Sequence, residues 1–245
     1  MRLDTVVDST PLDRLDALRL TYRGARAENV LAGILAEFPG QVALVSSFGA
    51  EAAVLLHMVS RIDPATPVLM IDTLMLFDET LAYQRDLSAH LGLRNVRHLR
   101  PEAADLAALD PDDTLHQRDP DACCVIRKVA PLDRALARWP VTVTGRKRFQ
   151  SSTRAALEVF DADGPRLKVN PLAHWRAAEI RAYMDLHELP RHPLVARGYP
   201  SIGCAPCTTR VMPGEDARAG RWRGTDKIEC GIHIGADGRI LRAAS

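Results

Sequence analysis

Short strand-like runs alternate with longer amphipathic segments along most of the chain. Residues 42–45 form an apolar run, which is typical of a strand buried on both faces of a parallel sheet. The pattern predicts further strands over 68–71, 96–99, 141–144 and 167–170. It predicts helices over 11–22, 26–38 and 177–187, and helices that begin at Ala52 and near Asp78. This alternation indicates an α/β fold with a doubly wound, mostly parallel sheet.

Polar residues follow the first two strands where each strand ends. Residues 46–51, Ser-Ser-Phe-Gly-Ala-Glu, lead from the first strand into a helix. In this geometry backbone N–H groups and the helix dipole can bind a phosphate or sulfate. The segment lacks the Gly-Lys-Ser/Thr ending of a Walker loop, and it also fits an ordinary strand-to-helix turn. Asp72 and Thr73 end the second strand, where open α/β sheets bind ligands.

The chain has 245 residues, a hydrophobic fraction of 47% and a formal net charge of +1. This fits one large domain, or one domain with appendages, and the charge offers no field that would recruit nucleic acid or an acidic membrane. No apolar run approaches the roughly 18 residues that span a bilayer, and the N-terminus lacks the apolar region of a secretory signal. We therefore expect a cytoplasmic protein whose cysteines serve metal binding or catalysis.

The five cysteines form two pairs and one single residue. Cys204 and Cys207 are a C-x-x-C pair on a loop rich in glycine and proline, close enough to share a metal, a cluster or a disulfide. Cys123 and Cys124 are adjacent, and ligation by both is favoured over a strained disulfide between them. Two buried cysteines acting as small apolar residues are the alternative. The inventory suggests four ligands and one nucleophile, Cys230.

A helix start precedes the adjacent pair. Asp119 fits the N-cap and Pro120 the first helical position, which sets Cys123 and Cys124 in the first turns. The helix dipole favours thiolates there. Lys128 lies four residues after Cys124, so its ammonium lies on the same helix face.

Two basic groups are candidate anion sites. Residues 145–154 follow the fourth strand directly and carry four basic residues, which could clamp a doubly charged anion at the mouth of the sheet. A second group surrounds Trp222 and contains Arg218, Arg221 and Arg223. The alternatives are a solvated basic turn for the first group and a flexible basic linker for the second.

Six stretches carry these features in a specific combination. They are Ser-Phe-Gly-Ala-Glu at 47–51, Cys-Cys-Val-Ile-Arg-Lys-Val-Ala-Pro-Leu at 123–132, Gly-Arg-Lys-Arg-Phe-Gln-Ser-Ser-Thr-Arg at 145–154, Tyr-Pro-Ser-Ile-Gly-Cys-Ala-Pro-Cys-Thr at 199–208, and Arg-Ala-Gly-Arg-Trp at 218–222 with Glu-Cys-Gly-Ile-His at 229–233. Together they resemble the assimilatory adenylyl-sulfate (APS) and phosphoadenylyl-sulfate (PAPS) reductase family. The resemblance covers residues 42–233, most of the chain.

The resemblance implies an adenine-nucleotide alpha-hydrolase-like fold with a mobile C-terminal tail. It divides the chain into an N-terminal helical segment (1–40), an α/β domain that binds nucleotide and cluster (41–210), and a catalytic tail (211–245). The implied activity is thioredoxin-dependent reduction of APS to sulfite and AMP through an S-sulfonate on Cys230. It belongs to assimilatory sulfate reduction and cysteine biosynthesis, with thioredoxin or a glutaredoxin-like protein as reductant.

The resemblance also assigns residues. Cys123, Cys124, Cys204 and Cys207 match the ligands of a [4Fe–4S] cluster, whose presence in the family points to APS as substrate. The matches to substrate contacts are Ser46, Ser47, Gly49, Ile71, Asp72, Thr73, Lys128, Gly145, Lys147, Arg148, Arg218 and Arg221. The chain departs from the family at Leu74 and Met75, where the usual residues are glycine and a basic residue. No nucleic acid or membrane partner is expected, and a homo-oligomer is compatible with the sequence.

Three other functions are compatible with the same residues. The substrate could be PAPS, or both nucleotides. A zinc module held by four thiolates is a second alternative, which the near-zero net charge and the nucleotide-like sheet disfavour. The third is a nucleotide-binding sulfurtransferase with Cys204 and Cys207 as a redox pair, which leaves Cys123 and Cys124 without a role.

Overall fold

The structure is a computed structural model of the whole chain, and it describes residues 10–225, 227 and 229. Cys230, the expected nucleophile, and the last part of the expected tail lie outside the described residues. The core is a six-stranded sheet with the order β3-β2-β1-β4-β6-β5. The strands are β1 Val42–Ser46, β2 Val68–Ile71, β3 Val96–Leu99, β4 Val141–Thr144, β5 Phe160–Asp163 and β6 Arg166–Val169.

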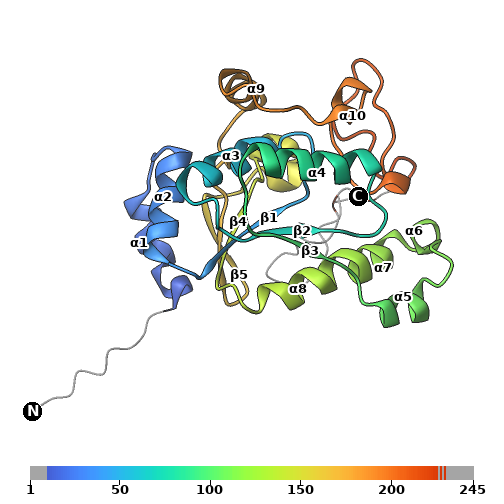
Figure 1. Cartoon of the computed structure of the whole chain (residues 1–245), viewed down its shortest axis with the longest axis horizontal. Helices are drawn as coiled ribbons and strands as arrows, with labels where there is room; N and C mark the ends of the chain where they lie inside the picture. Colours follow the sequence, from blue (N-terminus) through green and yellow to red (C-terminus); the bar gives the residue numbers. More distant parts are fainter. Residues whose placement is uncertain (1–9, 226, 228, 230–245) are drawn as a thin grey trace, which may run out of the picture.

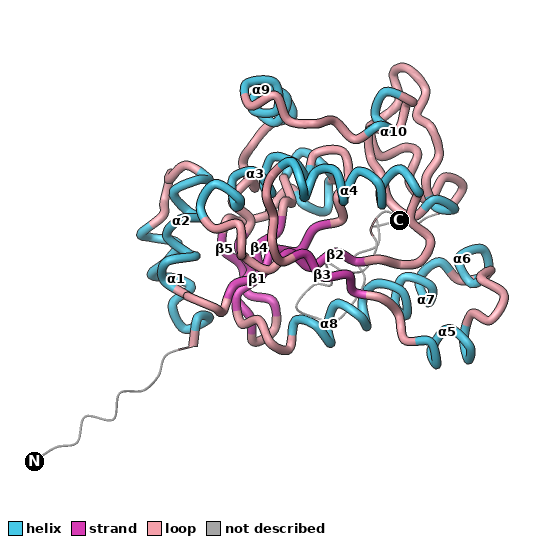
Figure 2. Tube along the Cα trace, in the orientation of Figure 1, coloured by secondary structure: helices cyan, strands magenta, loops and turns pink. Residues whose placement is uncertain are grey.

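Helices connect these strands and cover them on both sides. The helices are α1 Leu15–Thr21, α2 Ala27–Glu37, α3 Ala52–Ile62, α4 Asp78–His90, α5 Ala103–Leu109, α6 Leu115–Arg118, α7 Pro120–Cys124, α8 Ala130–Leu136, α9 Ala177–Leu186 and α10 Pro193–Ala196. Shorter helical turns are η1 Pro11–Arg14, η2 Val125–Val129, η3 Arg148–Gln150, η4 Ser152–Arg154 and η5 Ala205–Cys207. Figures 1 and 2 show α3 and α4 along one side of the sheet and α8 along the other.

Alternate residues of the strands supply two apolar layers. Val42 and Leu44 of β1 belong to the large core cluster that also contains buried residues of α2, α3 and α9. Ala43, between them, belongs to a smaller cluster with Leu132 and Leu136 of α8. Successive side chains of a strand point to opposite faces, so a continuous apolar run is what a sheet covered on both faces requires.

The predicted α/β class is confirmed, and so are the five predicted strands, the last of them displaced by one residue. β5 was not predicted. It pairs antiparallel with β6 at the edge of the sheet, after a turn in which Gly164 has a φ of 59°. Phe160 is its one fully buried residue. A strand covered on one face has no apolar run. Phe-Asp-Ala-Asp alternates apolar and polar residues over only four positions, two of them aspartates that strands disfavour, so its signal is weak.

The adjacent cysteines lie in a helix that changes its winding directly after them. Asp119 caps α7 by accepting hydrogen bonds from the N–H groups of residues 121 and 122, and Pro120 takes the first position, as predicted. The next turn, η2, is π-helical. Pro131 has no N–H to donate to the preceding turn, and a π-helical turn accommodates such an interruption. Arg127 and Lys128 in this turn are buried.

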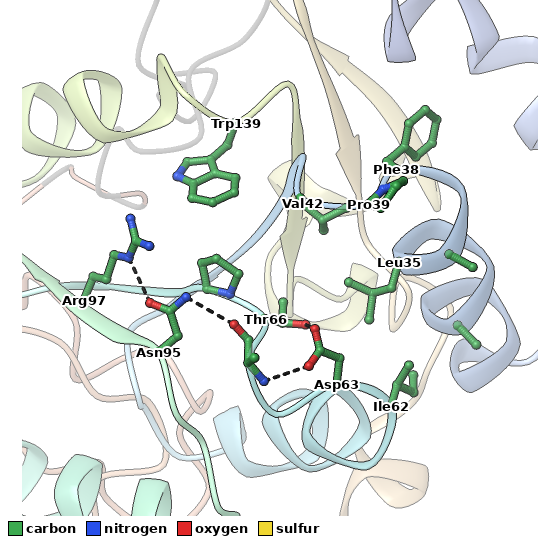
Figure 3. Close-up of a pocket in the computed structure, with 15 residues that line it drawn as sticks. Leu35, Phe38, Pro39, Val42, Ile62, Asp63, Thr66, Asn95, Arg97 and Trp139 are labelled. Atoms are coloured by element: carbon green, nitrogen blue, oxygen red, sulfur yellow. Dashed lines mark hydrogen bonds between the residues drawn. The ribbon is translucent and has the colours of Figure 1, made fainter.

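The sheet has a topological switch point between β1 and β4. From β1 the chain proceeds to β2 on one side, and from β4 it proceeds to the edge strand β5 and then to β6 on the other side. Open α/β sheets bind ligands in the crevice beyond the carboxyl ends of the strands at such a point. A cavity of about 530 Å³ lies at the other end of the sheet, lined by residues such as Pro67, Asn95 and Trp139 (Figure 3). The loops after β1, β2 and β4 lie at the carboxyl ends of the strands beside the switch point, and they form the candidate functional site.

A buried hydrogen bond between Thr80 and His192 connects α4 to the start of α10, and burial of the histidine makes stability depend on pH. His192 Nδ1 accepts a hydrogen bond from Leu194 N, so Nε2 carries the proton that it shares with Thr80 Oγ1 at 3.1 Å. Burial lowers the pKa of His192 from 6.5 to about 4. As the pH falls between these two values, the unfolded chain takes up the proton first. Stability should therefore fall over this range, by up to about 3 kcal/mol from this residue.

Denaturant unfolding of the wild type and His192→Asn, from about pH 7.5 down to about pH 4.5, tests this expectation. Asparagine keeps an acceptor for the helix cap but does not titrate. The difference in stability between the two proteins should therefore narrow as the pH falls. A difference that stays constant over the range would contradict the assignment.

Candidate active site

The loop after β1 contains a buried residue with a strained backbone. Ser46 Oγ accepts a hydrogen bond from Phe48 N at 3.1 Å. Phe48 is fully buried and has a φ of 49°, in the left-handed region that bulky residues rarely adopt. Such conformations concentrate at ligand-binding turns. Ser47 and Gly49, two of the expected phosphate contacts, flank this residue just before α3.

The end of β2 is held by its neighbours on both sides. Asp72 is buried and accepts hydrogen bonds from Leu74 N and, at 2.9 Å, from Arg100 Nε. Burial raises the pKa of Asp72, but these hydrogen bonds and His98 outweigh it and leave the pKa below its ordinary value. Thr73 turns to the cysteines, since its Oγ1 lies 3.2 Å from Cys204 Sγ.

The two cysteine pairs meet beside this strand end. Cys123, Cys124 and Cys204 are buried, Cys207 is partly buried, and all four are free thiols. Burial, with added repulsion from Cys124 and Cys204, raises the pKa of Cys123 to about 12. Burial and the same two neighbours also raise the pKa of Cys207. The four sulfur atoms therefore share one electrostatic environment, in which ionised thiols need nearby positive charge.

The C-x-x-C loop is held between two other segments. Ala205 N donates a hydrogen bond to Met75 O at 2.8 Å, which joins the loop to the residues after β2. Trp222 N donates to Cys207 O at 3.0 Å, which joins it to the second basic group. In the described part of the chain, no three Cys, His, Asp or Glu side chains converge as they do around a single metal ion.

Positively charged side chains surround the buried ring of Trp222. Four cationic side chains surround its ring, and the distances to the ring centroid are 4.4 Å for Arg221, 5.8 Å for Lys227, and 6.0 Å for both Lys128 and Arg218. Each of these distances allows a cation–π attraction. Lys128 Nζ also lies 3.5 Å from Cys124 Sγ, so the positive charge adjoins the thiols.

Arg221 packs directly on the cysteine loop. Its Nη1 donates a hydrogen bond to Ile202 O at 3.2 Å. A Cβ atom added to Gly203 would lie 2.2 Å from Arg221 Nη2, so a side chain at Gly203 would displace the guanidinium. Gly203, which directly precedes Cys204, therefore leaves the space that the Arg221 guanidinium occupies.

Arg127 is a residue of the site that the sequence analysis left without a role. Its guanidinium is 1% exposed, and it donates to Asp110 Oδ2 at 2.6 Å and to Thr73 O at 3.0 Å. Burial lowers the pKa of Arg127, but its bonds to Asp110 and Asp113 outweigh this and leave the pKa raised. Arg127 thus joins the helix of the adjacent cysteines to the end of β2. The acidic stretch at 101–118 was the one sequence signal for this role, because a buried arginine needs acidic partners and Asp110 and Asp113 lie in that stretch.

The basic segment after β4 does not form one positive surface. Lys147 is buried, and its Nζ donates to Glu51 Oε2 at 2.6 Å. Arg148 turns away to Glu158, with 2.7 Å between Nη2 and Oε1. A Cβ atom at Gly145 would make ordinary contact with its nearest neighbour at 3.6 Å, so space alone does not demand glycine there.

The structure separates the expected residues around the paired cysteines from the expected basic residues after β4. Around the four paired cysteines, the structure brings together Thr73, Lys128, Arg218 and Arg221. Lys147 and Arg148 have acidic partners outside that group. Cys230 lies outside the described residues.

Residues 41–210 match the model of the phosphoadenosine phosphosulfate reductase domain. The chain belongs to this family. The resemblance drawn from the motifs is therefore confirmed. Within the part of the chain that the structure describes, no helix has both the length and the apolar character that a bilayer crossing requires.

Relatives of the reductase family match most of the chain. A protein named adenosine 5'-phosphosulfate reductase from Mesorhizobium japonicum is 55% identical over 80% of this chain and 78% of its own length. One of the same name from Chelativorans sp. is 48% identical over 91% of this chain and 94% of its own. The crystal structure of a PAPS reductase from Candida auris superposes with a TM-score of 0.70 at 26% identity, over 82% of this chain and 98% of that chain.

Leu74, one of the two positions where the chain departs from the family, has a strained backbone. Leu74 has a φ of 60° and is 53% exposed, so its side chain contributes little burial while its backbone takes a conformation that favours glycine. Leu74→Gly should therefore be more stable than Leu74→Ala by about 1 kcal/mol, because alanine keeps the steric cost of the left-handed region. Denaturant unfolding of the two variants measures the difference. An alanine variant at least as stable as the glycine variant would contradict this account.

Proposed function

We propose that this protein reduces APS to sulfite and AMP, with thioredoxin or a glutaredoxin-like dithiol protein as reductant. The observation that carries the proposal is the meeting of two cysteine pairs, 80 residues apart in sequence, beside buried cations at the carboxyl end of a parallel sheet. The names of the Mesorhizobium and Chelativorans relatives support APS as the substrate. The reaction would serve assimilatory sulfate reduction and cysteine biosynthesis in the cytoplasm.

Four thiols in this arrangement suit a [4Fe–4S] cluster better than a single ion. Each iron of such a cluster takes one thiolate, so the ligands surround a cube instead of converging on one point. Cys123, Cys124, Cys204 and Cys207 would hold it. The bound cluster would supply a compact negative charge close to the substrate. Lys128, whose ammonium contacts Cys124 Sγ, would offset that charge, and the Thr73 hydroxyl would donate a hydrogen bond to Cys204 Sγ.

The remaining residues of the site would bind and neutralise the substrate. The turn of Ser46, Ser47 and Gly49 would hold the phosphate next to α3, and the ends of β2 and β4 would flank the nucleoside. Arg218 and Arg221 would bind the sulfate oxygens beside Lys128. The sulfur of the mixed anhydride is electrophilic but shielded by negative oxygens, so these cations allow a thiolate to approach it.

The chemistry requires one nucleophile, Cys230, carried by the proposed catalytic tail of residues 211–245. Its thiolate attacks the sulfur, the S–O bond to the phosphate breaks, and AMP leaves with the bonding electron pair. The product on the protein is an S-sulfonate. One thiolate of the dithiol protein then attacks Cys230 Sγ, and sulfite leaves with the electron pair of the S–S bond, which gives a mixed disulfide between the two proteins. The second thiol of the dithiol attacks its partner sulfur in this mixed disulfide, which releases the Cys230 thiolate and leaves the reductant as a disulfide.

PAPS is a second candidate substrate. The family's own description and the Candida auris relative both name this nucleotide. Its additional phosphate would need a basic contact on the nucleoside side of the site. Arg100, which is 61% exposed and pairs with Asp72 after β2, is a candidate for that contact.

Steady-state assays with APS and PAPS, with a recycled thioredoxin, test this proposal. We expect kcat/KM for APS to exceed that for PAPS by at least about tenfold, an energy difference of about 1.4 kcal/mol. Cys230→Ser should lose sulfite formation while its affinity for AMP stays within about twofold of the wild type. A preference for PAPS would overturn the choice of substrate. Sulfite formation by Cys230→Ser would overturn the mechanism.

A further inference from the structure

The residue before the proposed nucleophile has an unusual environment. Glu229 is 3% exposed, and its carboxylate receives two hydrogen bonds from Arg154, from Nε at 2.9 Å and from Nη2 at 3.0 Å. Arg218 Nη2 donates to the same carboxylate at 3.3 Å. A bidentate arginine pair is among the strongest and most directional contacts in proteins. Burial of a carboxylate is unfavourable without such partners, so this segment is fixed at Glu229.

The carboxylate is one end of a continuous polar network. Arg154 Nη1 donates to Gln150 Oε1 at 2.6 Å, and Gln150 Nε2 donates to Glu51 Oε2 at 2.9 Å. Glu51 in turn pairs with Lys147. The network thus runs from the loop after β1, through the segment after β4, to Glu229. These are the two loops that border the switch point of the sheet.

A second contact holds the same segment on the side of the cysteines. Lys227 forms an ion pair with Asp121 and donates to Pro120 O at 3.1 Å, both in the first turn of α7. α7 ends in the adjacent cysteines. Residues 227 and 229 are therefore fixed to elements on two sides of the candidate site. Of the residues in these two sets of contacts, only Arg218 has a role in the chemistry proposed above.

We propose that Glu229 is a positioning residue for Cys230. Its carboxylate, bound by Arg154 and Arg218, fixes the point from which the chain continues to the nucleophile. Arg154 couples this point to the loops that would hold the nucleotide. The inference rests on the proposed function of Cys230. It differs from a rival explanation in which the carboxylate fills an anion site that the substrate later occupies.

Single-turnover formation of the Cys230 S-sulfonate, measured by mass spectrometry of the intact protein with APS, separates the two explanations. Loss of the anchor should slow this step by about tenfold in Glu229→Gln and by on the order of 100-fold in Glu229→Ala. Affinity for AMP should stay within about twofold. Arg154→Gln should reproduce the effect, and the double variant Arg154→Gln/Glu229→Gln should be no slower than the slower single variant.

A matched control is available in the same part of the chain. Glu215 pairs with Arg223 and lies outside the network, so Glu215→Gln should leave the rate of S-sulfonate formation unchanged. Tighter binding of AMP by Glu229→Gln, with an unchanged rate, would overturn the proposal in favour of the filled anion site. An unchanged rate together with unchanged affinity would overturn both explanations.

A substrate-free readout keeps this test independent of the proposed function. The rate at which iodoacetamide alkylates Cys230, read from the peptide that contains it, should rise at least about fivefold in Glu229→Gln and not in Glu215→Gln. An equal alkylation rate in all three proteins would contradict the anchor whatever the substrate. If the wild type forms no S-sulfonate with APS while the alkylation result holds, the proposed function fails and the anchor stands.

Discussion

The candidate site depends on one buried ion pair, between Arg127 and Asp110. Their side chains are 1% and 0% exposed, and the guanidinium also binds the Thr73 carbonyl. Removal of one partner from a buried pair of this kind costs roughly 3–5 kcal/mol, because the other charge is left without compensation. With its guanidinium fixed by Asp110, Arg127 connects the helical turn after Cys123 and Cys124 to the strand end that contacts Cys204. This contact therefore helps to fix the relative position of the two cysteine pairs.

Charge on the two sides of the site is arranged differently. On the cysteine side, cations gather around Trp222 and reach the thiols through Lys128. Lys227 and Arg218 of this group pair with Asp121 and Glu229. The four cations outnumber these two acidic partners, which suits a site in which thiolates and the sulfate group of a mixed anhydride would be close together. On the side of the β1 and β4 loops, Lys147 and Arg154 are balanced by Glu51 and Glu229. Those cations hold loops in position, and the structure gives them acidic partners before any substrate is bound.

The sequence predicted those parts of the molecule whose structure is set by neighbouring residues in the chain. Buried strands and the capped start of α7 each have a signal within a few residues, and both were found. β5 was missed because a strand covered on one face alone has no apolar run. Arg127 and Glu229 were missed for another reason. Their partners lie 17 and 75 residues away, and a charged residue has no local signature that tells a buried ion pair from a solvated side chain.

The same limit applies to the basic segment 145–154. Its composition suggested a single anion clamp, whereas Lys147 and Arg148 have separate acidic partners, Glu51 and Glu158. The cysteine motifs were more informative because thiols are rare in this chain and their spacing restricts the chemistry. Even so, spacing could not show that the residues after β2 and the C-x-x-C loop are joined by a backbone hydrogen bond.

The most direct measurement is iron and acid-labile sulfide analysis of the protein purified without oxygen. The proposed cluster predicts about four irons and about four sulfides per chain, with the same content in Cys230→Ser and a loss of both in Cys204→Ser. One zinc per chain without sulfide, or no metal at all, would contradict the central claim that the four paired cysteines hold an iron–sulfur cluster.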